Sequence, residues 1–370
     1  MNTNMKSLKY LLAITALSLS TFAFGQTVLD ANLVDGNLPR ATQAEKADVN
    51  LNLLKKYKSA AKERKLNINS IMVLRHGKVV YEEWFGRNKP KDLHVMYSVT
   101  KTWNMTAIGF AVDEGLISLD DKVISFFPDM LPEVVTEKLG AMKVRHLLTM
   151  TTGNIENEIN ARRRENHKED YIKGFLACTV HRQPGTYYEY NSEASFMLAA
   201  ILQRVTGMTV REYLQSRLFE PLQITNLRWD EVQGINHGGY GLYIQTESMA
   251  KLGQLYLQKG MWNGKRLLSE KWIQMASSYQ TFSIPASNDP EKLTPEQKAG
   301  DFTAGYGFQM WRCRWPDAYR ADGAKGQYIM VLPNEDAVIA ITSNEANLQG
   351  IIQLAWDYAA SALIMPKDNE

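Results

Sequence analysis

The sequence is poor in the residues that build disulfide scaffolds and metal sites. The 370-residue chain has 2 cysteines, Cys178 and Cys313, and 6 histidines. So few cysteines exclude a disulfide-built scaffold. The two thiols can pair in an oxidising compartment, but two free thiols are the favoured state. No Cys-x-x-Cys and no His-Glu-x-x-His is present, so we expect no metal and no cofactor.

An excess of one charge and a long apolar run are also missing. The chain has 42 Lys and Arg against 40 Asp and Glu, a formal charge of +2. Nucleic acid is therefore not an expected partner, because binding it needs a basic surface. No stretch beyond the N-terminal segment is apolar enough to span a membrane. With 45% hydrophobic residues the chain can bury a large core.

The first residues have the layout of a secretory signal peptide. Lys6 and Lys9 precede the short apolar run Tyr10–Leu17, and small residues follow up to Gly25. We predict a signal peptide over 1–25, with an uncleaved anchor as the alternative, and a polar tether over 26–45. Removal of the segment takes away two lysines and no acids, so the charge falls to about zero. A periplasmic or secreted protein without stable membrane insertion is then expected.

The apolar pattern predicts an α+β fold, an α/β sandwich within residues 46–365. Short apolar runs across tight turns predict a hairpin near each end of the chain. Helical spacing over 49–65 and 347–363 predicts helices that flank the sheet, and an all-helical insert is expected over roughly 120–240. The predicted strands are 71–74, 79–81, 328–332 and 337–341. The polar stretch 283–301 is predicted to be a surface loop, with a lid as the alternative.

A Ser-x-x-Lys sequence stands just before a run that is apolar nearly all round. In a helix, Ser98 and Lys101 lie on one face, which puts an amine within reach of a hydroxyl. Serine is a poor nucleophile unless a neighbouring base takes its proton. A lysine serves as that base only where burial or a nearby cation lowers its pKa. The buried run 105–112 indicates such an environment.

Four stretches together resemble the serine β-lactamase-related superfamily. Their order and spacing match its branch of class C β-lactamases, D-alanyl-D-alanine carboxypeptidases, esterases and 6-aminohexanoate-dimer hydrolases from about residue 45 to 362. The stretches are Ser98-Val99-Thr100-Lys101, residues 144–153, residues 184–190 with the helix up to 207, and Gly305–Phe308 with Gly323–Tyr328. The resemblance implies a β-lactamase/transpeptidase-like fold and acyl-enzyme chemistry on a small-molecule or short-peptide amide or ester substrate.

The resemblance also implies roles for individual residues. Ser98 resembles the nucleophile, Lys101 the amine that shares its proton, and Tyr190 the tyrosine that relays a proton to the leaving group. Backbone N–H groups of Ser98 and Gln327 would form the oxyanion hole. The residues expected to contact the substrate are Ser192, Ala324, Lys325, Gly326 and Trp311.

Two departures from the family pattern bear on the substrate. The usual Tyr-x-Asn is here Tyr190-Asn191-Ser192, and Ala324 takes the place of the cation in the third motif. In the β-lactamases and carboxypeptidases that cation helps to hold a substrate carboxylate. An exported hydrolase of an amide or ester without that carboxylate is therefore expected. The alternatives are a β-lactamase, a D-alanyl-D-alanine carboxypeptidase, and a non-catalytic penicillin-binding-like protein.

A Ser-His-Asp triad is the weaker interpretation of the catalytic residues. The chain lacks the Gly-x-Ser-x-Gly elbow that presents the serine in many such enzymes. We therefore expect structural roles for the histidines at positions 94, 146, 181 and 237.

Overall fold

The computed structural model describes residues 37–155, 170–284 and 293–364. The predicted signal peptide and its cleavage site lie outside these ranges. Within them, no helix has both the length and the apolar character needed to cross a membrane.

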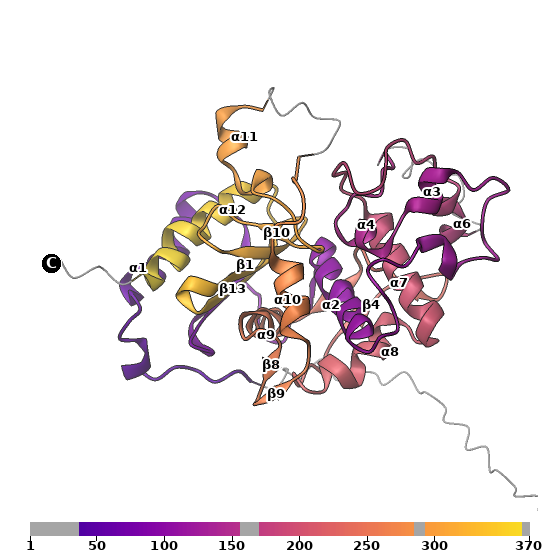
Figure 1. Ribbon diagram of the computed structural model, residues 1–370. Coiled ribbons are helices and arrows are strands. Elements are labelled where there is room, and N and C mark those ends of the chain that lie inside the picture. Colours follow the sequence, from indigo (N-terminus) through magenta and orange to yellow (C-terminus); the bar gives the residue numbers. More distant parts are fainter. Residues whose placement is uncertain (1–36, 156–169, 285–292, 365–370) are drawn as a thin grey trace, which may run out of the picture.

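The centre of the molecule is a six-stranded antiparallel sheet built from both ends of the chain (Figure 1). Both predicted hairpins are confirmed, and they lie side by side: β1 pairs with β13, with Val73 opposite Ile339. All residues of β12 and β13 are buried, which explains their continuous apolar runs. In sheet order the strands are β10 (Trp311–Arg312), β11 (Tyr319–Gly323), β12 (Gln327–Leu332), β13 (Ala337–Ser343), β1 (Ile68–Arg75) and β2 (Lys78–Trp84).

Helices cover both faces of the sheet, as a sandwich requires. On one face lie α1 (Leu51–Glu63) and α12 (Leu348–Leu354). A π-helical and then a 3-10 segment continue α12 up to Leu363. On the other lie α9 (Thr246–Leu257) and α2 (Thr100–Asp113). Every residue of α2 from Thr100 to Ala111 is buried, polar ones included, because the helix runs through the middle of the molecule.

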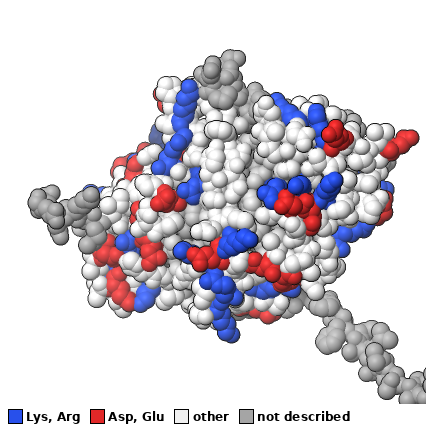
Figure 2. Space-filling model, viewed as in Figure 1, with Lys and Arg blue, Asp and Glu red and all other residues white. Residues whose placement is uncertain are grey.

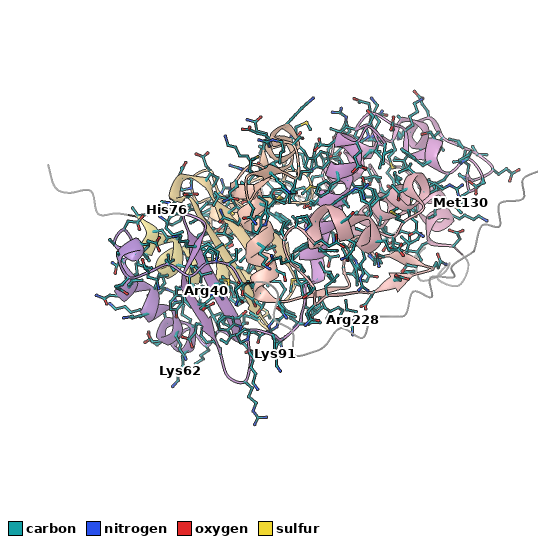
Figure 3. The ribbon with its side chains drawn as sticks, turned by 90° about the horizontal axis from the view of Figure 1, so that it is seen from below. Arg40, Lys62, His76, Lys91, Met130 and Arg228 are labelled. Carbon is teal, nitrogen blue, oxygen red and sulfur yellow. The ribbon has the colours of Figure 1, made fainter. Side chains whose placement is uncertain are left out.

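The helices between residues 123 and 219 form an all-helical subdomain beside the sheet. Its longest helix, α7 (Ser192–Thr206), packs against α2 and joins the two parts. Figure 3 shows the resulting elongated shape, with His76 of the β1–β2 turn near one end and Met130 of the subdomain near the other. The remaining helical elements are η3 (Val123–Phe126), α3 (Glu137–Ala141), α4 (Val144–Leu148), α6 (Tyr171–Leu176), α8 (Val210–Leu214) and η4 (Gln215–Phe219).

The described part of the predicted tether, residues 37–45, is packed against the domain. Leu38 is 5% exposed, and its backbone N–H donates to the Glu247 carboxylate. Arg40, labelled in Figure 3, forms ion pairs with Glu82 at 2.7 Å and with Glu247 at 2.8 Å. Residues 37–45 of the predicted tether are therefore held against the domain by partners that lie far away in the sequence.

Both cysteines are free thiols. The Cys178 thiol donates to the Gly174 carbonyl over 3.2 Å, within the helical subdomain. Cys313 follows β10, and burial raises the pKa of its thiol to about 11. The favoured expectation of two unpaired thiols is confirmed.

Candidate active site

Ser98 lies in a short 3-10 turn, η2 (Tyr97–Val99), which leads directly into α2. The turn is held from below by β7 (Leu242–Ile244), whose Leu242 carbonyl accepts from Met96 N–H at 2.8 Å. Tyr97 has φ 44°, a conformation uncommon for any residue but glycine. Backbone strain of this kind gathers at functional sites and presents a half-buried Ser98 at the end of the helix.

Lys101 is buried, 1% exposed, with its amine among three oxygens. Its Nζ donates to Ser98 Oγ at 3.1 Å, to Ser192 Oγ at 3.1 Å and to the Gly239 carbonyl at 2.8 Å. An ammonium group here would donate to all three oxygens, and a neutral amine would donate to two and accept from one of the two serine hydroxyls. The predicted contact between Ser98 and Lys101 is thus present, and Ser192 joins them.

Gly239 is a site residue that the sequence interpretation missed. Its N–H donates to His237 Nδ1 at 3.0 Å, and its carbonyl holds Lys101. A Cβ on Gly238 would lie 2.1 Å from the Ser195 carbonyl, and one on Gly239 would lie 2.9 Å from the Ser192 carbonyl. Only a residue without Cβ lets this loop approach α7 so closely. The two consecutive glycines, Gly238 and Gly239, are the feature of the sequence that could have pointed to this loop.

Tyr190 is half-buried beside Lys101 in a group of aromatic rings. Lys101 Nζ lies 4.8 Å from the ring centre. The Trp311 ring stacks on Tyr190 with centres 5.9 Å apart, and Tyr306 meets it edge-on at 6.4 Å. The structure therefore brings Tyr190 and Trp311 to the Ser98 site, as expected.

The order Tyr190-Asn191-Ser192 has a local explanation. Asn191 is the N-cap of α7: its side-chain oxygen accepts from the backbone N–H groups of Glu193 at 2.9 Å and Ala194 at 3.2 Å. Because this cap occupies the amide, the hydroxyl of Ser192 is the group that reaches the lysine.

The strand beside the nucleophile is β11, and this corrects the predicted third motif. A Cβ on Gly323, the last residue of β11, would lie 2.5 Å from the Met96 carbonyl oxygen and 3.2 Å from Val99 N. A Cβ on Gly326 would instead meet Ile351 at 2.3 Å, on the α12 face of the sheet. The match to the family's third motif had placed Gly326 at the site, where the structure has Gly323.

Three of the predicted site residues lie in or just after the β11–β12 turn: Ala324, Lys325 and Gln327. Gln327 is buried in β12 opposite Gly323, and its side chain donates to the Ser343 carbonyl at 2.7 Å. Ala324 and Lys325 are exposed in the β11–β12 turn. Among the described residues, neither Ser98 N–H nor Ala324 N–H has a protein acceptor. Gly323, and not Gly326, is therefore the glycine that packs against the backbone of the Ser98 turn.

A buried ion pair lies behind this strand, and the sequence interpretation missed it. Arg320 Nε contacts Asp322 Oδ2 at 2.9 Å, with side chains 0% and 7% exposed. Burial raises the pKa of Asp322 to about 6, although Arg320 opposes the shift. The Arg320 guanidinium also lies 4.9 Å from the Phe302 ring centre and 5.6 Å from that of Trp311. The positive charge of Arg320 therefore interacts with groups inside the protein, namely the Asp322 carboxylate and the two aromatic rings.

A cavity of about 520 Å³ opens next to Tyr190. The predicted loop 283–301 supplies much of its wall, since it contains helix α11 (Pro295–Ala299). The residues that line the cavity are Tyr188, Tyr190, Ser283, Ile284, Leu293, Glu296, Gln297, Gly300, Phe302, Thr303, Trp311 and Gln349.

Comparison with known proteins bears out this architecture. Residues 59–364 match the Beta-lactamase family along most of the chain. The chain belongs to the beta-lactamase family. A 6-aminohexanoate-dimer hydrolase of Paenarthrobacter ureafaciens is 24% identical over 294 residues, which cover 75% of this chain and 72% of that one.

Solved structures of the beta-lactamase family type share the fold. EstCE1, a hydrolase with promiscuous acyltransferase activity, superposes with a TM-score of 0.68 at 15% identity, covering 84% of this chain and 99% of its own. The octameric penicillin-binding protein homologue from Pyrococcus abyssi gives 0.65 at 20% identity, covering 84% and 76%. The family membership makes this chain a hydrolase.

The histidines of this beta-lactamase family chain have structural settings. His146 Nδ1 accepts the Lys143 N–H at the start of α4, and the His237 ring stacks on Tyr240 at 3.6 Å. His94 belongs to the short strand β3 (His94–Val95), and burial lowers its pKa. Over the part of the chain that the structure describes, no three His, Cys, Asp or Glu side chains are grouped to hold a metal.

Proposed function

We propose that this chain is an exported serine hydrolase that cleaves an amide or ester bond through an acyl-enzyme on Ser98. One observation carries the proposal: the buried amine of Lys101 contacts Ser98 Oγ at 3.1 Å, in a turn against which Gly323 of β11 packs. This arrangement supplies a nucleophile and its base within one small volume. The similarity to a 6-aminohexanoate-dimer hydrolase and to EstCE1, a hydrolase with acyltransferase activity, supports a hydrolase that forms an acyl-enzyme.

The geometry supports a two-step reaction. Ser98 Oγ attacks the carbonyl carbon while its proton passes to the neutral amine of Lys101, and the backbone N–H of Ser98 stabilises the oxyanion. Collapse of the tetrahedral intermediate breaks the bond to the leaving group, which takes a proton from Tyr190, and Tyr190 regains a proton from the ammonium group of Lys101. Water then attacks the acyl carbon by the same route and releases the acid and Ser98.

Labelling with a fluorophosphonate probe tests the nucleophile. Ser98 and Ser192 form a matched pair, because each hydroxyl lies 3.1 Å from Lys101 Nζ. The wild-type protein and Ser192→Ala should both carry the probe on the peptide that contains Ser98, and Ser98→Ala should not be labelled. Equal labelling of wild type and Ser98→Ala would contradict the mechanism.

A turnover assay separates this proposal from a non-catalytic, penicillin-binding-like role. Hydrolysis of p-nitrophenyl acetate should fall at least about 1,000-fold in Ser98→Ala and in Lys101→Met. Lys251→Met is the matched control, since Lys251 is also 1% exposed but donates to the Gln223 carbonyl. Folded wild-type protein without turnover of any ester or amide would favour the binding role.

Export has its own test. The proposed signal peptide rests on Lys6, Lys9 and the apolar run that follows. Mass spectrometry of the protein from the producing cells should show a mature N-terminus at or near Gln26. Recovery of the chain with Met1 intact in the cytoplasmic fraction would contradict export.

A further inference from the structure

We propose that the cavity beside Tyr190 binds an uncharged, apolar chain attached to the scissile ester or amide group. The inference rests on the proposed serine hydrolase function and names its substrate class. It starts from the walls of the cavity.

Four aromatic rings form one continuous wall. Trp311 contacts Phe302, Tyr188 and Tyr190, with ring centres 5.6, 6.2 and 5.9 Å apart. Ile284 and Leu293 add aliphatic surface. Aromatic and aliphatic walls favour a chain that leaves water when it binds. Because Tyr190 is also the proposed proton donor, a group bound here lies next to the reacting bond.

The charges around the cavity disfavour an anionic substrate end. Among the described residues that line it, the one charged side chain is the exposed Glu296. Arg320 does not line the cavity, since its guanidinium is fully buried behind Phe302 and Trp311 and contacts Asp322. Figure 2 shows a largely uncharged surface between α11 and α4, over β10. A carboxylate would therefore lose water here without gaining a cationic partner.

The wall that carries Phe302 is fixed in place before a ligand binds. The neighbouring carboxylate of Asp301 is buried and accepts from the Arg314 backbone N–H at 2.9 Å and from Trp356 Nε1 at 3.1 Å. The Asp301 carbonyl in turn accepts from Arg320 at 3.2 Å. These bonds tie the wall to β11 and to the C-terminal helix. Because the pocket is preformed, ordering of its residues costs little free energy when a chain binds.

The size of the expected effect follows from transfer energies. Each methylene fully removed from water favours binding about fourfold, and the open side of the pocket reduces this gain. Four added methylenes, from acetate to hexanoate, should therefore raise kcat/KM by about tenfold to a hundredfold.

Two matched ester series test the inference. One varies the acyl chain from acetate to hexanoate on p-nitrophenol, and the other varies the alcohol from methyl to hexyl on acetate. A gain of at least tenfold in either series supports the proposal and shows which side of the bond occupies the cavity. Phe302→Ala should lower the ratio of long-chain to short-chain kcat/KM at least fivefold. Ser277→Ala, on α10 (Glu270–Ser277) outside the lining, is the control for that ratio.

Charged chain ends complete the test. An ester that ends in a carboxylate should react at least tenfold more slowly than its neutral isostere. Flat rates along both series, or a faster reaction of the carboxylate or an ammonium analogue, would overturn the inference. If Ser98-dependent acetate hydrolysis persists in that case, the proposed function stands and this inference alone is wrong. If wild type and Ser98→Ala hydrolyse all esters equally, the proposed function itself is wrong.

Discussion

The amine of Lys101 lies 4.8 Å from the centre of the Tyr190 ring, and this contact connects the two halves of the candidate proton relay. The lysine comes from α2 and the tyrosine from the turn before α7, so the packing of these two helices sets the distance. A cation at this range stabilises a phenolate more than a phenol. The tyrosine can therefore give up a proton to a leaving group and regain it afterwards.

Loss of the Tyr190 hydroxyl should impair catalysis without disturbing the fold. Tyr190→Phe keeps the ring that stacks on Trp311 and removes the proton donor. We expect kcat for hexyl acetate, whose alkoxide leaving group needs a proton, to fall about 100- to 10,000-fold, the usual contribution of a general acid, with little change in KM. Tyr306→Phe, in the same aromatic group, is the control and should stay within a fewfold of wild type. Equal losses in both variants would point to a packing effect.

Alanine at two nearby glycines should separate catalysis from stability. Gly323→Ala places a Cβ 2.5 Å from the Met96 carbonyl and pushes β11 away from Ser98. A displacement of this size should lower kcat about 100-fold. Gly326→Ala, at φ 81° and against Ile351, should lower the free energy of unfolding by about 1 kcal/mol or more and leave kcat of the folded protein nearly unchanged.

Steady-state kinetics at a temperature well below each variant's Tm measure the two effects separately. The assignment of β11 to the site would be wrong if Gly326→Ala lost kcat and Gly323→Ala kept it.

Removal of Arg320 should leave a buried carboxylate without its counter-charge. Arg320→Met should lower the free energy of unfolding by about 3–5 kcal/mol at pH 7.5, as is usual when one partner of a buried ion pair is lost. The loss should be smaller at pH 5, because Asp322, whose pKa is already raised to about 6, then takes up a proton. Urea denaturation at the two pH values measures both.

An exposed ion pair provides the control for Arg320→Met. Arg228 lies 3.3 Å from Asp230, with side chains 60% and 49% exposed. Arg228→Met should change the free energy of unfolding by less than about 1 kcal/mol at either pH. A loss from Arg320→Met that did not depend on pH would show that Asp322 stays ionised throughout.

Two histidines should titrate on opposite sides of the ordinary histidine range. Hydrogen bonds that the ring of His76 donates to the carboxylates of Asp336 and Asp48 raise its pKa. Burial, followed by the charges of Arg145 and Lys143, lowers the pKa of His146 to about 4. Nitrogen-15 NMR between pH 4 and 8 should therefore find His146 neutral where His76 is still charged, with assignment by His76→Gln and His146→Gln.

These shifts also set opposite pH effects on stability. The raised pKa of His76 contributes stability below the unfolded value of about 6.5, and that contribution is lost as the pH rises through the folded value. The lowered pKa of His146 costs stability as the pH falls below about 6.5. An unchanged pKa of His146 in His76→Gln, and of His76 in His146→Gln, would confirm that the two residues titrate independently.

The sequence was sufficient where local pattern and burial agree. Strands β12 and β13 are buried on both faces, so their apolar runs predicted strands without knowledge of which strands they pair with. Ser98 and Lys101 were readable because three residues make one helical turn. Asn191 against Ser192 was noticed as a departure, but its role as a helix cap needed the start of α7.

Strand β11 could not be predicted from the sequence. It contains Arg320 and Asp322, and charged residues argue against a buried strand. The two charges compensate each other only in the folded state, where Phe302 and Trp311 cover the guanidinium. Without β11 as a guide, Gly326 was the natural choice for the third motif. The contacts of residues 37–45 were hidden for a similar reason, since Glu82 and Glu247 lie far along the chain.

The pairing of β1 with β13 has a consequence for how the molecule is made. Ile68 and Ser343 face each other across this pair, so nearly the whole chain must leave the ribosome before the sheet can close. Contacts of such long sequence separation slow folding, because the intervening loop must first be closed. Until then the hairpin of β1 and β2 has an open apolar edge, which invites pairing with other chains. A nascent chain that ends before Ala337 lacks the strand that covers this edge. Chaperones would have to bind the exposed edge until β13 has been made.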